Sequence, residues 1–422
     1  MSEWRRTRLK FLAALPIRNG LGEPGTLGEP DWPRYIRTTD IAGPRSLRSD
    51  TFASLPPELA KQAPVHENDL LLSAAGTVGK SLLYRAKEPA CYAGYLVRLR
   101  PRPTVDPRFL AYWTETPAFL DQVETGKVTS TIDNFSASKY QNLAIQIPGL
   151  EMQRAIADYL DVETARIDAL IENKRRMVEL LETRRMTVMA DGVGGELTSP
   201  KLVPSALPWI RLRGATWPIV RLSLVAQLGS GHTPSRGHPE WWTDRSIPWI
   251  TTGEVARLRS DRIEFLHETR ESISEVGLAN SAAELHPAGT VVLCRTASAG
   301  YSAIMGLPMA TSQDFATWTC GPRLRPRFLL LCLRVMRQDL LGRLAMGSTH
   351  KTIYMPDIEG IKVPLPGVVE QDAIVEAVWA RLHKIDLAMD ALRTQLSLLT
   401  ERRQALITAA VTGELAIPGV AA

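Results

Sequence analysis

Residues 153–197 read QRAIADYLDVETARIDALIENKRRMVELLETRRMTVMADGVGGEL, and residues 371–415 read QDAIVEAVWARLHKIDLAMDALRTQLSLLTERRQALITAAVTGEL. The second stretch repeats the first at a constant offset of 218 without a gap, so that Gln153 matches Gln371. Both end in Gly-Glu-Leu, where the glycine suits the left-handed position that closes a helix. A repeat of this length indicates a chain built from two related halves.

Each repeated stretch is expected to form one long helix. From Gln153 to Ala190 there is no Pro or Gly, and apolar residues recur at alternating spacings of three and four. A helix of this length rises about 57 Å and needs a partner for its apolar seam. The two helices most simply pack on each other, although self-association between chains would satisfy the same pattern. The predicted seam consists of Ile156, Leu160, Ile167, Leu170, Met177, Leu181 and Val188, and of Ile374, Val378, Ile385, Leu392, Leu399 and Leu406.

Polar residues interrupt both predicted seams and are expected to set the register by pairing across them. They are Glu163, Lys174 and Arg184 in the first helix, and Arg381, Gln395 and Arg402 in the second.

Composition and charge indicate a soluble protein with two basic domains. Hydrophobic residues make up 45% of the 422 residues and charged residues 23%, which is ordinary for globular chains. Residues 1–150 hold 19 Lys and Arg against 15 Asp and Glu, and residues 201–366 hold 19 against 13. The helical stretches are slightly acidic, so positive charge belongs to the two domains between them. Ordinary solvent-exposed charge, without any role in binding, would explain the same excess of Lys and Arg.

Four cysteines without CxxC spacing favour a reducing compartment and argue against a zinc site. Arg5-Arg6 before a short apolar run resembles an export signal. However, Trp4, Arg8 and Leu9 match Trp217, Arg221 and Leu222, so these residues are expected to belong to a folded domain.

The sequence before each long helix predicts a mixed α+β domain, and the two domains are expected to repeat each other loosely. Short β-like stretches such as Asp69–Ser73 and Tyr95–Leu99 precede a helical stretch that opens at Pro107. The second domain repeats this order, with a helical stretch from Pro326. Residues 134–140 (NFSASKY) are expected to be an insertion without an equal-length counterpart in the second half.

Several polar loops carry donors suited to DNA phosphates or base edges. Residues 76–81 (GTVGKS) end like a phosphate-binding loop, but Ala74 replaces a required glycine and a tight polar turn is the default. The loops at 126–131, 231–236 and 347–352 have structural turns as their competing interpretation, and Trp241-Trp242 is expected to be core. The candidate DNA-binding residues are Thr77, Lys80, Lys127, Thr129, Ser130, Lys139, Thr233, Ser235, Arg236, Arg295, Ser298, Tyr301, Thr349, His350 and Lys351.

Catalytic motifs such as GxSxG, HExxH and GxGxxG are absent from the sequence. The chain is therefore expected to catalyse no reaction alone and to hold no metal.

The order of domain, long helix, domain, long helix resembles the specificity subunit of type I restriction-modification enzymes. Residues 404–415 (QALITAAVTGEL) are similar to that family's helix ending, and residues 205–210 (SALPWI) to its entry into the second domain. The resemblance implies target-recognition domains at residues 1–148 and 200–366, and helices at 149–199 and 367–416 that form an antiparallel coiled-coil spacer, followed by a tail at 417–422. It thus implies an α+β fold with a pseudo-two-fold internal repeat.

The resemblance also implies function. Each domain would read one half of a split site in double-stranded DNA, and the helices would set the spacing and dock two modification subunits. S-adenosylmethionine, ATP and Mg would belong to these partners and to the restriction subunits, and the complex would act in the cytoplasm against foreign DNA. The alternative is a scaffold unrelated to DNA, in which a coiled coil holds two binding modules apart.

Overall fold

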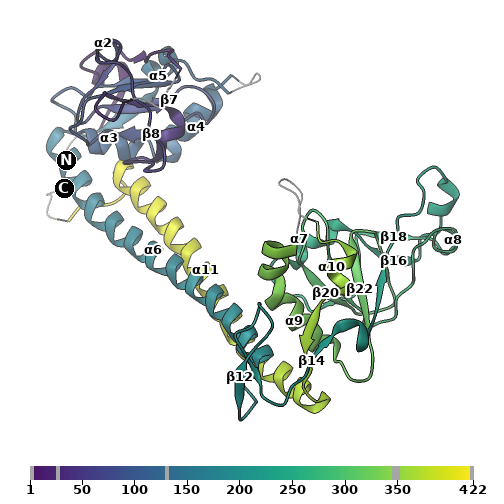
Figure 1. The fold of residues 1–422 in the computed structure, drawn as a ribbon. Coiled ribbons are helices and arrows are strands. Elements are labelled where there is room, and N and C mark those ends of the chain that lie inside the picture. The colour runs from purple at the N-terminus through teal and green to yellow at the C-terminus, as the bar shows by residue number, and fades with distance from the viewer. Residues whose placement is uncertain (1–3, 25–28, 129–132, 345–351, 419–422) are drawn as a thin grey trace. The chain divides into compact units, whose positions relative to one another are not determined.

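The computed structural model describes residues 4–24, 29–128, 133–344 and 352–418 (Figure 1). Its contacts divide the chain into two compact units. Unit 1 comprises Met1–Arg176 and Arg393–Ala422, and unit 2 comprises Met177–Leu392. Both long helices therefore contribute one part to each unit. In the part of the chain that the structure describes, neither long helix nor any other is apolar enough over sufficient length to cross a membrane.

Unit 1 is a mixed domain of short strands and helices. Its elements are β1 (Arg5–Arg8), α1 (Leu9–Leu12), β2 (Arg18–Asn19), β3 (Arg34–Ile36), η1 (Thr38–Asp40), β4 (Ile41–Gly43), β5 (Ser46–Leu47), α2 (Pro57–Ala60), β6 (Pro64–Val65), β7 (Leu70–Ser73), β8 (Ser81–Leu83), β9 (Ala90–Tyr92), β10 (Leu96–Leu99), α3 (Pro107–Trp113), α4 (Pro117–Gly126), α5 (Ala137–Asn142) and β11 (Ala144–Ile147), before α6 (Leu150–Gly194). The sheets have the strand orders β2-β10-β7-β8, β3-β9-β6, β1-β11 and β4-β5.

The core of unit 1 joins the domain to the helices. Phe109 and Tyr112 of α3 pack in one cluster with Ile156 of α6 and Ile407 of α11. Helix α3 begins where expected, because Pro107 occupies its first turn and the Asp106 carboxylate accepts from the backbone N–H groups of its next residues. The predicted helical stretch from Pro107 is two helices, since Thr114–Thr116 separate α3 from α4.

Unit 2 repeats this plan with a larger sheet. Its elements are β12 (Leu202–Pro204), β13 (Leu212–Gly214), β14 (Ile219–Arg221), η2 (Leu222–Leu224), β15 (Ala226–Ser230), η3 (Pro239–Trp242), β16 (Ile247–Ile250), η4 (Thr252–Glu254), α7 (Val255–Leu258), β17 (Phe265–Leu266), β18 (Glu271–Ile273), α8 (Glu275–Ala279), β19 (Val291–Cys294), β20 (Ser302–Met305), β21 (Ala310–Thr311), β22 (Phe315–Cys320), α9 (Pro326–Asp339), η5 (Leu340–Leu344), α10 (Met355–Glu359), β23 (Lys362–Pro364) and α11 (Val368–Thr412). The sheets have the orders β15-β22-β19-β20-β17, β18-β16-β21, β14-β23 and β12-β13.

The same contacts attach each domain to the start of its helix. In unit 1, Gln153 is buried, accepts from the Asp106 N–H (2.9 Å) and donates to the Pro148 carbonyl (2.8 Å). In unit 2, Gln371 accepts from the Arg325 N–H (2.8 Å) and donates to the Pro366 carbonyl (2.9 Å). These glutamines therefore satisfy buried backbone groups at equivalent places in both halves.

The helix ends are also closed alike. Gly413 has φ +82° and an added Cβ would lie 2.7 Å from the Trp4 ring, while Gly195 has φ +88° and the same clearance from Trp217. Only glycine fits both the left-handed backbone and the close indole. The predicted glycine ends and the match of Trp4 with Trp217 are confirmed, and β1 places Arg5 and Arg6 in the folded domain.

Within each unit, α6 and α11 run antiparallel. In unit 1, Arg403 Nε donates to Asp168 Oδ1 (2.8 Å) and Lys174 Nζ to Gln395 Oε1 (2.6 Å). In unit 2, Arg185 Nε donates to Asp386 Oδ1 (3.1 Å). The Lys174–Gln395 bond was expected from the interrupted seams. Arg184 and Arg402 are exposed, however, and the neighbouring Arg185 and Arg403 make the ion pairs instead.

The seam itself differs from the prediction in two places. Leu170 and Met177 are 49% and 52% exposed, and Ile171 is buried and Val178 half-buried in their stead. The other predicted seam residues are buried or half-buried: Ile156, Leu160, Ile167, Leu181, Val188, Ile374, Val378, Ile385, Leu392, Leu399 and Leu406.

The expected insertion at residues 134–140 has a structural counterpart. Phe135 N–H donates to the Ala74 carbonyl before α5, and Ile353 N–H donates to the Arg295 carbonyl before α10. Each short helix leads into the final strand of its domain, β11 or β23. The prediction of an unmatched insertion was wrong, because unrelated side chains build the same backbone connection.

Candidate nucleic-acid interface

The candidate residues Thr77 and Lys80 lie on a tight turn between β7 and β8 of unit 1. Gly76 and Gly79 have φ +76° and +86°, and the Gly79 N–H donates to the Ser73 carbonyl (3.4 Å). The Ser73 hydroxyl donates to the Thr77 carbonyl (2.5 Å) and accepts from the Lys80 N–H (2.9 Å). A strand follows this turn, whereas a phosphate-binding loop opens a helix. The default interpretation as a polar turn is confirmed.

The turn between β19 and β20 of unit 2 has the same backbone. Ala297 and Gly300 have φ +54° and +92°, and the Gly300 N–H donates to the Cys294 carbonyl (2.8 Å). Ser298 and Tyr301 thus correspond to Thr77 and Lys80. The two turns therefore occupy equivalent places in the two halves of the chain.

The two turns differ in what their side chains do. Thr77 and Lys80 are exposed, and among the described residues neither side chain has a recorded polar partner. In unit 2, the Tyr301 ring lies 4.4 Å below the Arg337 guanidinium carbon, so one of its faces is covered. The unit 1 turn is therefore the one with free donors for an anion.

Lys127 and Lys139 lie beside the unit 1 turn but are engaged within the domain. The Gly76 N–H donates to the Asp133 carbonyl, which brings Asp133 against the turn. Lys127 Nζ pairs with Glu124 (2.6 Å) and Asp133 (3.2 Å), and the Glu124 hydrogen bond raises the pKa of Lys127. Lys139 Nζ donates to the Gly126 carbonyl (2.7 Å). Both lysines offer less to a ligand than their sequence positions suggest.

Thr233 and Arg295 of unit 2 are brought together by a residue that sequence reasoning missed. Thr233 Oγ1 donates to Gln313 Oε1 (2.6 Å), and Arg295 Nε donates to the Gln313 carbonyl (2.9 Å). The next residue, Asp314, accepts from Thr296 Oγ1 (2.5 Å). A single exposed Gln between two strands carries no pattern that could have identified it.

Arg236 lies over the indole of Trp242, with its guanidinium carbon 3.7 Å from the ring centroid. The ring also packs edge-on against Trp249 (5.6 Å), and its Nε1–H donates to the Ser235 carbonyl (3.1 Å). Trp241 and Trp242 are half-buried rather than core, and the Arg236 pair with Glu271 (3.4 Å) is largely exposed. This leaves Ser235 and Arg236 accessible on a rigid aromatic support.

Thr129, Ser130, Thr349, His350 and Lys351 lie outside the described residues. Within the described ranges, no group of three or more His, Cys, Asp and Glu side chains is arranged to hold a metal ion. Cys91, Cys294 and Cys332 are buried free thiols, and burial raises the pKa of Cys91 to about 11.

A carboxylate in each unit, half-buried in Glu115 and buried in Asp261, gathers arginines where the domain meets a helix. In unit 1, Glu115 accepts from Arg403 of α11 (2.8 Å) and lies 3.5 Å from Arg45. In unit 2, Asp261 binds Arg337 (2.5 Å) through its carboxylate, and its carbonyl accepts from Arg185 of α6 (2.9 Å) and Arg334 (2.7 Å). These networks fix each domain on the helix segments of its own unit.

Known proteins share this repeated architecture. A family model described as the type I restriction modification DNA specificity domain matches residues 34–180 and 215–397. Similar curated proteins include the type I restriction enzyme StySPI specificity subunit of Salmonella potsdam, 24% identical over 174 residues, and the MjaIX specificity subunit of Methanocaldococcus jannaschii, 25% identical over 161 residues. These matches cover 40% and 37% of this chain and 37% and 36% of the relatives. The match thus spans little more than a third of the curated relatives' length.

Two solved structures share the fold over nearly the whole chain. One, from work on complex assembly and conformational transition of the type I R-M system, has a TM-score of 0.75 and 18% identity, with 98% of each chain covered. The HsdS subunit from Thermoanaerobacter tengcongensis has a TM-score of 0.53 and 17% identity, with 98% and 97% covered. At such low identity the likeness establishes the fold alone.

Proposed function

Because this chain belongs to the type I restriction modification DNA specificity domain family, we propose that it is the DNA-recognition subunit of a type I restriction-modification complex. Residues 1–148 and 200–366 are its target-recognition domains, and each reads one half of a bipartite site. The relatives' names identify them as specificity subunits of type I restriction enzymes, which supports the same role here.

One observation carries the proposal: the attachments to the helices repeat, whereas the side chains on the equivalent polar turns do not. Gln153 and Gln371 make the same bonds, as do the Arg403–Asp168 and Arg185–Asp386 pairs. The equivalent turns instead present Lys80 in one unit and Tyr301 in the other. Two domains that recognise different half-sites from the same pair of helices need a constant attachment to these helices and different side chains toward the DNA.

DNA contacts are proposed for the exposed donors of these loops. Thr77 and Lys80 offer a hydroxyl and an ammonium group to phosphate oxygens, and Arg236 offers a guanidinium for a phosphate or a guanine edge. Both domains carry excess positive charge, which favours the backbone of a duplex.

The chain itself is proposed to be non-catalytic. Methylation would come from two modification subunits that carry S-adenosylmethionine, and translocation and cleavage from restriction subunits that use ATP and Mg. All would act on DNA in the cytoplasm. The chain's part is to hold the two half-sites at a fixed distance through an antiparallel coiled coil of α6 and α11.

The spacing role can be tested by deleting one heptad from each helix around the Lys174–Gln395 bond. Seven residues shorten the rod by about 10.5 Å, roughly three base pairs. Mapping of methylated sites in cells that express the partner subunits should then show the same two half-sequences with a shorter spacer. The control replaces the same heptads by others of equal length and should leave the spacer unchanged.

An unchanged spacer in the deletion variant would defeat the spacing role. The alternative, a scaffold unrelated to DNA, predicts that the purified chain has no salt-dependent affinity for any duplex. Duplex binding that weakens as salt rises is expected instead.

A further inference from the structure

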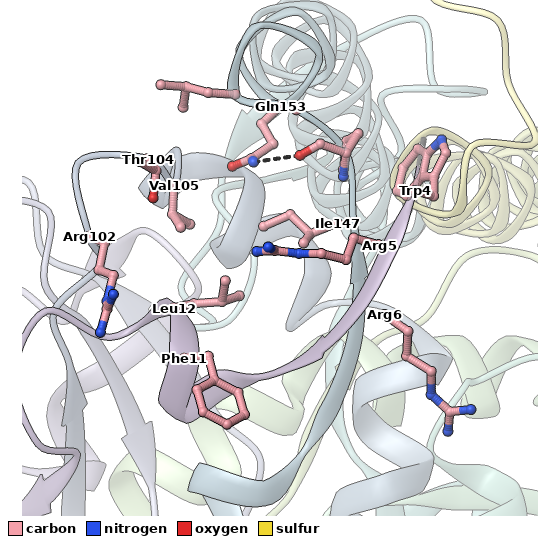
Figure 2. Close-up of a pocket in the computed structure, with 13 residues that line it drawn as sticks. Trp4, Arg5, Arg6, Phe11, Leu12, Arg102, Thr104, Val105, Ile147 and Gln153 are labelled. Carbon is pink, nitrogen blue, oxygen red and sulfur yellow. Dashed lines mark hydrogen bonds between the residues drawn. The ribbon is translucent and has the colours of Figure 1, made fainter. Parts of the chain in front are cut away.

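A pocket of about 930 Å³ lies in unit 1 where the domain meets the start of α6 (Figure 2). Strand β1, the loop that carries Arg102 and Val105, and residues 147–150 form its walls. It does not include the polar turn or its neighbouring loop. Its chemistry is therefore separate from the proposed DNA contacts.

The lining of this pocket is cationic. It contains Arg5, Arg6 and Arg102, and none of its lining residues is Asp or Glu. Figure 2 shows the Arg5 side chain extending from β1 into the pocket, toward the loop with Arg102. Arg102 Nε donates to the Ala13 carbonyl (3.0 Å), which fixes the root of that guanidinium. Arg5 and Arg6 are exposed, and among the described residues neither has a recorded ion pair.

The pocket also offers apolar surface. Leu12, Val105 and Ile147 are buried and contribute to its lining, and Phe11 at its edge is 59% exposed. The Phe11 ring thus adds exposed apolar surface beside the buried apolar lining of the pocket.

Unit 2 shows that the fold does not require these arginines. The positions equivalent to Arg5, Arg6 and Arg102 are Pro218, Ile219 and Gly321. Strand β14 nevertheless pairs with β23 as β1 pairs with β11. The residue at the place of Phe11 is Leu224, which is 74% exposed. Exposed apolar surface thus occurs in both halves, whereas this arginine set occurs only in unit 1.

We infer that this pocket binds an acidic segment of a partner protein that carries a large apolar side chain. Guanidinium groups from two walls would pair with carboxylates, and the apolar residue would cover Phe11 and the buried lining. A DNA duplex fits less well, because its phosphates lie on a convex rod and would leave the apolar lining in water. Since the arginines occur once, the chain has one such site although its helices repeat.

The test uses the full-length chain without DNA or other subunits, so it is independent of the proposed function. The probe is a fluorescein-labelled peptide of about eight residues, roughly 26 Å when extended, built from Glu and Leu around one Phe. Its control replaces each Glu by Gln. Fluorescence anisotropy should show saturable binding of the acidic peptide at one site per chain, and about tenfold weaker binding of the control.

Variants locate the site. R5A with R102A should weaken binding about tenfold, whereas R85A with K87A removes the same charge from exposed positions of unit 1 and should have little effect. R5K with R102K should restore part of the affinity, and thermal unfolding should show that all variants are folded. The inference is overturned if R5A/R102A binds the peptide as the unaltered chain does, if both charge-removal pairs weaken binding equally, or if a short duplex displaces the peptide.

Discussion

The two units attach and close their long helices in the same way, but they build the arginine networks between domain and helix differently. Both attach the start of a long helix through a buried glutamine, and both close a helix end with a glycine under an indole. Their arginine networks, in contrast, are built around Glu115 between α3 and α4 in unit 1, and around Asp261 between α7 and β17 in unit 2. The glutamine and glycine contacts are thus the same in both units, while the arginine networks between domain and helix differ.

The networks also differ in how much charge is buried. Arg334 is fully buried, and burial lowers its pKa to about 10 while Asp261 opposes the change. In unit 1, burial lowers the pKa of Arg403, but hydrogen bonds to Glu115 and Asp168 raise it above its ordinary value. In unit 2, Arg334 and Arg337 therefore share the Asp261 carboxylate, whereas Arg403 in unit 1 pairs with two carboxylates, Glu115 and Asp168.

The largest difference between the units should follow removal of the central carboxylates. D261A removes the carboxylate that pairs with Arg337 (2.5 Å) and lies 3.6 Å from the fully buried Arg334. It should lower the free energy of unfolding by about 4 kcal/mol. E115A should cost about 2 kcal/mol, because Arg45 and Arg403 keep Asp161 and Asp168 as partners. Urea denaturation of both variants measures the difference, and equal losses would show that the networks are equivalent.

The shared attachment should respond alike in both units. Q153L and Q371L each leave a backbone N–H and a buried carbonyl without a partner, which should cost about 3 kcal/mol in either case. Q371L also removes a bond to the Arg323 carbonyl (2.8 Å), but that carbonyl is only partly buried. Hydrogen exchange at the Asp106 and Arg325 amides can follow the loss locally. If only one substitution lowered the free energy of unfolding, the same geometry would not contribute the same stability in both units.

The polar turns should separate the units in DNA binding. K80E places a carboxylate where we propose that an exposed ammonium contacts phosphates, and should weaken duplex affinity about tenfold and lower the salt dependence. Y301E should have a smaller effect, because Arg337 covers that ring. Titrations at several salt concentrations are the measurement, with K87E as the control for lost charge. Equal effects of K80E and K87E would remove the turn from the interface.

The smallest expected effect is a pH dependence that belongs to unit 2. Burial lowers the pKa of His286, so the folded state favours the neutral ring. Its contribution is fully present above the ordinary histidine pKa of about 6.5 and is lost as the pH falls below it, by less than about 1 kcal/mol. Unfolding followed from pH 7.5 to 5 should show a smaller pH dependence for H286Q. If the stability of H286Q changed with pH as that of the unaltered chain does, other titrating groups would cause the pH dependence.

The repeat allowed the sequence to predict the architecture, but it could not fix the seam. Leu170 and Ile171 are adjacent apolar residues, as are Met177 and Val178, so either member of each pair satisfies a heptad pattern. Only contact with the partner helix selects Ile171 and Val178. The same shift by one residue explains why Arg184 was expected where Arg185 makes the ion pair.

The candidate site was predictable where backbone conformation leaves a glycine signal. The tight turn at residues 76–81 was expected from its glycines, and Gly76 and Gly79 both have a positive φ, as Gly300 has in the counterpart of unit 2. Whether a side chain on such a loop is free could not be predicted. Lys127 is engaged by Glu124 and Asp133, and Lys80 is exposed, yet the two lysines look alike in the sequence.

The division of the helices between units has a consequence for the order of folding. Unit 2 is one continuous segment, so it can be completed once residue 392 has been synthesised. Unit 1 needs Ile407 and Val411 in its core and Gly413 under Trp4, although its domain is synthesised first. On the ribosome, the first domain must therefore wait for the last helix. Contacts between residues this distant in sequence make its completion the slow step of folding.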